Sequence, residues 1–157
     1  MKSRHAHRRP SLELNRRRKT IIYAVLVLTW LSGAVWLLLH YFFAREGEFG
    51  REPNPLEFWV LALHGACAFV VLWLFGWVWT THIMPWWGGR RRRASGVVLI
   101  SLAAVLILSG YLLYYGSGDT LREWTGLVHW SIGLVAAIPV LVHALRSRRY
   151  RSHYRPR

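Results

Sequence analysis

The sequence alternates between long apolar stretches and short polar connections. Four stretches are each long enough for a helix that crosses a bilayer, which needs about 20 residues; they are approximately Ile21–Phe43, Phe58–Ile83, Val97–Tyr115 and Leu121–Leu145. Because the connections are short, consecutive helices should be antiparallel neighbours. The pattern predicts an all-α fold: an integral membrane, up-and-down four-helix bundle over residues 21–145, with basic tails at residues 1–20 and 146–157.

Positive charge is concentrated at one predicted side of this bundle. The net charge is +14, and of the 21 Lys and Arg residues only Arg45, Arg51 and Arg122 lie outside the two tails and the middle connection. Six of the seven acidic residues lie in or directly beside the other two connections. The positive-inside rule therefore predicts that both termini are cytoplasmic. The basic flanks should contact anionic lipid headgroups rather than nucleic acid.

The fourth apolar stretch carries two histidines, His129 and His143. They are fourteen residues apart, which places them on nearly the same face of a helix and roughly 21 Å apart. Small residues share this face: Gly126, Gly133, Ala136 and Val140. Such a face could accommodate a flat ligand beside each imidazole, or it could serve only for close helix packing.

The second apolar stretch carries a comparable pair. His64 begins a run of small residues that ends at Ala68, and His82 follows eighteen residues after His64. Eighteen residues correspond to five turns, so the two side chains should face the same way, roughly 27 Å apart.

The second and fourth helices should run in the same direction, from the outer to the cytoplasmic side of the membrane. His64 would then lie at the depth of His129, and His82 at the depth of His143. Two facing imidazoles are a usual axial ligand set for haem iron. Zinc normally requires three or four clustered ligands, and the mid-membrane carboxylates that a proton relay often uses are absent from the sequence. Histidines that only make hydrogen bonds between helices remain the alternative, in a non-haem membrane subunit or scaffold.

With its four helices and its motif His129-x-x-x-Gly133 followed by His143, the chain resembles membrane cytochromes b of the cytochrome b561-like type. That group includes the anchor subunits of formate dehydrogenases and hydrogenases. The resemblance implies one or two b-type haems, held by His64 with His129 and by His82 with His143. It also implies electron transfer between a quinone pool and a redox partner subunit, in a bacterial inner membrane. The single cysteine, Cys67, excludes a Cys-x-x-Cys-His attachment site, so the haem would be non-covalent.

Two departures from this group concern the cytoplasmic site. Some members take a haem ligand from the cytoplasmic half of the first helix, which has no histidine here. Others space the two histidines of the second helix fourteen residues apart, a position that Val78 occupies in this chain. The pair His64 and His129 is therefore the firmer prediction.

Further residues are candidates for helix packing and for a quinone site. The third stretch has no histidine, and its small residues Ser95, Gly96, Ser109 and Gly110 are predicted packing positions in a structural wall. A quinone site on the periplasmic side would need a polar group near the interface, for which His40, Glu57 and Glu123 are the candidates.

Overall fold

The structure is a computed structural model that describes residues 16–48, 50–84 and 93–153. Its elements in chain order are α1 (Arg16–Phe42), β1 (Arg45–Gly47), β2 (Gly50–Glu52), α2 (Leu56–Val78), η1 (Trp79–Ile83), α4 (Arg93–Tyr115), α5 (Asp119–Val135) and α6 (Ala137–His153). Most of the predicted tail at residues 1–20 and part of the basic middle connection lie outside the described residues. The prediction of four helices is confirmed, because four helical segments are long and apolar enough to cross a membrane, with mean hydropathy of 1.8 to 2.5.

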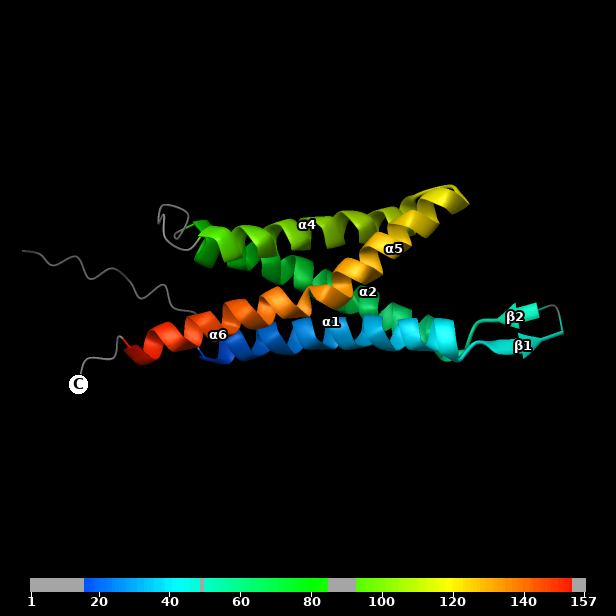
Figure 1. Ribbon diagram of the computed structural model, residues 1–157, viewed down its shortest axis with the longest axis horizontal. Helices are drawn as coiled ribbons and strands as arrows, with labels where there is room; N and C mark the ends of the chain where they lie inside the picture. Colours follow the sequence, from blue (N-terminus) through cyan, green and yellow to red (C-terminus); the bar gives the residue numbers. More distant parts are fainter. Residues whose placement is uncertain (1–15, 49, 85–92, 154–157) are drawn as a thin grey trace, which may run out of the picture.

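The helices form two hairpins that lie against each other. Helix α1 packs along α2, and α4 packs along α5, while α1 also contacts α5 and α4 contacts α6. Helix α1 begins and α6 ends at the same end of the bundle (Figure 1). We call this the tail end, and we call the opposite end, where the β-strands and the turn between α4 and α5 lie, the hairpin end.

The fourth apolar stretch, predicted as one continuous helix, is interrupted in the structure. Helix α5 ends at Val135, Ala136 forms a turn, and α6 begins at Ala137. Pro139 has no N–H group to donate to the Val135 carbonyl, so the regular helical ladder is interrupted there. The indole N–H of Trp30 on α1 donates to the Leu134 carbonyl beside this break, at 3.2 Å. This hydrogen bond thus connects the two hairpins at the break.

The second apolar stretch also changes its geometry near the tail end. The regular helix α2 passes into the π-helical turn η1, in which the Met84 N–H bonds the Trp79 carbonyl. A π-helical turn is wider than an α-helical turn, so it alters the direction in which the following side chains point. His82 lies within η1. The assumption of five regular turns between His64 and His82 is therefore wrong.

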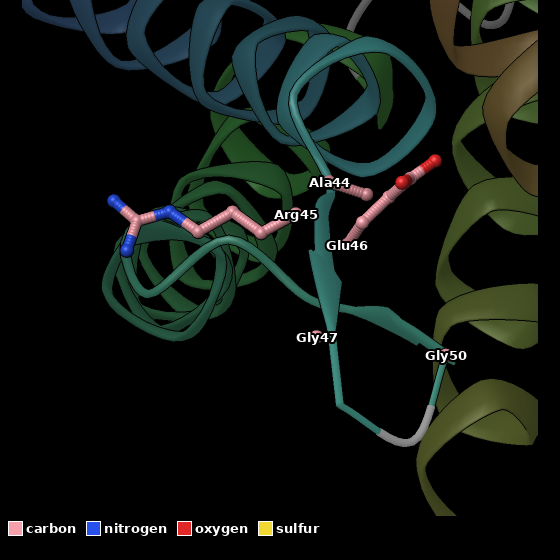
Figure 2. A pocket seen from close by; sticks show the side chains of 5 residues that line it. All are labelled: Ala44, Arg45, Glu46, Gly47 and Gly50. Atoms are coloured by element: carbon pink, nitrogen blue, oxygen red, sulfur yellow. The ribbon is translucent and has the colours of Figure 1, made fainter.

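The connection between α1 and α2 forms a small antiparallel hairpin, in which Arg45 pairs with Glu52 and Gly47 with Gly50. Gly50 has a φ of 112°, a conformation that side chains rarely adopt. Beside it lies a surface hollow of about 460 Å³, and the side chains of Arg45 and Glu46 point to opposite sides of the strand (Figure 2). The hollow is lined by Ala44, Arg45, Glu46, Gly47 and Gly50, and no histidine is among them.

Burial in this bundle is inverted relative to a water-soluble protein. Among the described residues, the most buried side chains are mostly polar: Ser32, Glu57, Ser109 and Thr125, together with Cys67 and Leu74. Large apolar side chains point outward, such as Phe69 at 77% exposed and Trp73 at 71%. The interior therefore consists mainly of polar and small groups, and two of its serines contact histidines.

Candidate functional site

His64 on α2 and His129 on α5 meet in the half of the bundle nearer the hairpin end. Their ring centroids are 6.3 Å apart, and the ring planes are nearly perpendicular at 87°. We call these two residues the hairpin pair. Both side chains are partly buried, and each comes from a different helical hairpin. The site therefore bridges the two halves of the molecule.

The His64 ring is held by helix α1. Its Nδ1 atom donates to the Thr29 carbonyl at 3.0 Å and lies 3.2 Å from the Ser32 hydroxyl. The ring lies close against Gly33, where an added Cβ atom would be 3.1 Å from Cε1 of His64. The imidazole is thus fixed between a serine, a carbonyl and a glycine of one helical turn.

The His129 ring is held by α4 in the same way. Its Nδ1 atom lies 2.8 Å from the Ser109 hydroxyl, and the ring also interacts with the Leu106 carbonyl. An added Cβ atom at Gly110 would lie 3.4 Å from Cε1 of His129. Leu106 precedes Ser109 by three residues, just as Thr29 precedes Ser32. Each hairpin therefore holds its imidazole on the same local motif, a Ser-Gly dipeptide with the carbonyl three residues before it.

His82 and His143 lie near the tail end, and we call them the tail pair. They are close enough to interact electrostatically, and Lys19 of α1 is also close to His82. The Nδ1 atom of His143 lies 3.3 Å from the hydroxyl of Ser95 on α4, which is followed by Gly96. An added Cβ atom at Gly96 would meet nothing within 4 Å, so this glycine does not press on the ring. The His143 ring is therefore less closely approached by Gly96 than the His64 and His129 rings are by Gly33 and Gly110.

Helix α4 has a larger role than that of a structural wall. Ser95 and Ser109 are fourteen residues apart, the same spacing as His143 and His129, so an antiparallel helix brings each serine to one histidine. This matched spacing is visible in the sequence and could have predicted the two contacts between serine and histidine. The contact between Ser32 and His64 had no such signal, because α1 carries only one Ser-Gly dipeptide.

Gly133, predicted to border a flat ligand, faces α4. An added Cβ atom there would lie 3.8 Å from Cδ2 of Leu106, which is ordinary contact distance. Gly126 lies opposite Leu113 in the same way. At these two positions the small-residue face of α5 is packed against α4.

The three candidates for a quinone site are not gathered in one place. Nδ1 of His40 lies 3.0 Å from Oε2 of Glu57, and the His40 ring stacks on Trp36 with centroids 4.8 Å apart. Oε1 of Glu57 accepts from the backbone N–H of Asn54 at 3.0 Å, so this carboxylate reaches back to the chain before α2 as the carboxylate of a capping box does. Glu57 therefore secures the start of α2 and its contact with α1. Glu123 is exposed on α5 and does not belong to this group.

The donor set limits which metal chemistry the hairpin pair could support. Within residues 16–48, 50–84 and 93–153, no group of three or more His, Cys, Asp and Glu side chains could hold a metal ion. A metal between His64 and His129 would need its other ligands from a cofactor. Comparisons of the chain with models of protein families, with curated proteins and with solved structures find no match.

Proposed function

We propose that the chain is a membrane-embedded b-type cytochrome that carries one or two bis-histidine haems. In this proposal His64 and His129 hold a haem near the hairpin end, and His82 and His143 hold a second near the tail end. The protein transfers electrons between a quinone pool and a redox partner subunit. A bound haem would supply one-electron redox chemistry, and the chain would supply ligands, spacing and a low-dielectric surrounding.

The observation that carries this proposal is the geometry of the hairpin pair. Metal–imidazole bonds are roughly 2 Å long, so two imidazoles on opposite sides of one metal ion would have ring centroids about 6 Å apart. The observed distance is 6.3 Å. On both rings Nδ1 is engaged by a serine, which leaves Nε2 for the metal. Haem supplies four equatorial nitrogen ligands of its own, so it fits a site that offers only two protein ligands.

Insertion in a membrane is supported by the inverted burial. Extended exposed apolar surface in a folded protein marks contact with a partner or a lipid phase. Here the exposed apolar side chains occur on all four candidate spans, as lipid contact requires. We propose that the tail end is cytoplasmic, because the Lys and Arg residues gather there in the sequence. A reporter fused after Arg157 should be active in the cytoplasm; activity only in the periplasm would contradict this orientation.

A specific observation also favours the alternative of a non-haem scaffold. Three of the four histidines contact serine hydroxyls on neighbouring helices, and such hydrogen bonds alone can hold membrane helices together. This function would need no cofactor.

Absorption spectroscopy separates the two functions. The protein is expressed with an ample haem supply and purified in detergent, and its reduced-minus-oxidised spectrum and haem-to-protein ratio are measured. We expect a Soret band, the low-spin spectrum of bis-histidine haem and a ratio of one or two. Folded protein without a Soret band would exclude the cytochrome and favour the scaffold.

A further inference from the structure

The structure assigns Ser32 and Ser109 as positioning residues that fix the tautomer and orientation of His64 and His129, so that Nε2 of each ring is the metal-binding atom. This inference rests on the proposed haem function. It concerns residues outside the predicted ligand set, on the two helices that contribute no ligand to the hairpin pair.

The first step concerns where each serine proton goes. The Ser32 hydroxyl donates to the Thr29 carbonyl at 2.9 Å, and the Ser109 hydroxyl donates to the Val105 carbonyl at 2.7 Å. A carbonyl oxygen can only accept, so in each case the single hydroxyl proton is committed to the serine's own helix. Each Oγ atom can then only accept a hydrogen bond from the neighbouring imidazole.

The second step concerns the imidazoles. Because Oγ accepts, the ring nitrogen that faces it must carry a proton, and that nitrogen is Nδ1 in both rings. For His64 the Thr29 carbonyl imposes the same protonation, since it lies 3.0 Å from Nδ1. A neutral imidazole with a proton on Nδ1 has its lone pair on Nε2. A ligand imidazole usually donates its other N–H to such an outer partner, which raises the basicity of the ligand.

The third step concerns the glycines. Gly33 and Gly110 directly follow the two serines, and an added Cβ atom at either position would meet the imidazole at 3.1 or 3.4 Å. The absence of a side chain lets the ring approach the helix closely enough to reach the hydroxyl. The Ser-Gly dipeptide thus acts as a unit. Each of the two helical hairpins supplies one such unit, and each unit holds one ring of the hairpin pair.

The test measures haem dissociation and the haem reduction potential in the full-length protein. The variants are Ser32→Ala, Ser109→Ala and Ser109→Thr, with Ser101→Ala as the matched control, because Ser101 is an exposed serine of the same helix α4. We expect both alanine variants to lose haem about 10–100-fold faster, the range typical of outer-partner removal. The reduction potential should shift to more positive values, because a less basic ligand stabilises ferric iron less.

The effect should be larger for Ser109, whose bond of 2.8 Å is shorter than the 3.2 Å of Ser32. Ser109→Thr keeps the hydroxyl and should stay close to the wild type in both measurements. Alanine variants that match Ser101→Ala would overturn the inference, as would equal behaviour of Ser109→Thr and Ser109→Ala. A wild-type protein without haem would instead refute the proposed function.

Discussion

The hairpin pair and the tail pair use the same residue type at comparable spacings, yet they are built differently. At the hairpin pair each imidazole has its own Ser-Gly dipeptide, and the two rings lie 6.3 Å apart. At the tail pair Ser95 supports His143 at 3.3 Å, and the adjoining Gly96 does not press on the ring. The difference shows that matched histidines alone do not define equivalent sites, because the helices behind them decide how firmly each ring is oriented.

The cause of this asymmetry can be traced to α1. The positions fourteen residues before Ser32 and Gly33 are Arg18 and Lys19, whereas α4 repeats Ser-Gly at this interval. Lys19 interacts with His82, and the Arg18 guanidinium lies 5.2 Å above the Trp77 ring. Near the tail end, the first hairpin therefore carries cations at the positions that correspond to the Ser-Gly dipeptide of the second hairpin. These cations suit the basic end of the bundle, and they differ in chemistry from the serine hydroxyl that contacts His143.

The largest expected effect is the removal of either imidazole of the hairpin pair. His64→Ala or His129→Ala would remove one of the two proposed haem ligands, and the position of the site within the apolar candidate spans would make replacement by water difficult. We expect the low-spin haem content of this site to fall by roughly tenfold or more, or the remaining haem to become high-spin. Haem content and the oxidised spectrum measure this. If both variants keep full low-spin haem, these residues are not the ligands.

The next largest loss of stability and haem should come from substitution of the glycines that contact the two rings. These substitutions test the difference between the hairpin pair and the tail pair. Gly33→Val would force a side chain against His64, and Gly110→Val would press less closely on His129. Overpacking of this kind costs about 1–3 kcal/mol of stability. Gly96→Val is the matched control on α4, since nothing lies within 4 Å of its added Cβ atom.

We expect thermal unfolding and haem loss to worsen in the order Gly96→Val, Gly110→Val, Gly33→Val. Equal effects at all three positions would show that the glycines serve general helix packing rather than the approach of the imidazoles.

The four helices could be predicted from the sequence because apolar stretches of about 20 residues are typical of helices that cross a membrane. The sequence did not predict the break at Ala136, although Pro139 indicates one, nor the π-helical turn Trp79–Ile83 around His82. The partners of the histidines were missed for a different reason. Serine in an apolar helix is commonly a packing residue, and only the relative placement of two helices shows that Ser109 faces His129. Likewise, pairing of His40 with Glu57 depends on how α1 meets α2.

A smaller effect is expected at the tail pair. His143→Ala should remove a second haem, if the protein carries two, while the spectrum of the hairpin pair is kept. His82→Ala should have the weaker effect, because His82 lies on a π-helical turn and has a cation beside it. Haem-to-protein ratios of the two variants measure this. Loss of both haems in His143→Ala would contradict the independence of the two pairs.

The smallest effect on haem is expected at His40, which is 45% exposed and belongs to neither pair. If quinol is oxidised at the hairpin end, His40 together with Glu57 could accept a proton there, so His40→Ala should slow quinol oxidation and leave the haem spectrum intact. Glu57→Gln is the companion variant: its amide oxygen can still accept from the Asn54 N–H, which preserves the start of α2. Quinol oxidation rates and spectra of both variants are compared. Slowed oxidation in both with unchanged haem assigns a proton-accepting role to the pair, whereas haem loss in His40→Ala would make His40 a folding residue or a ligand.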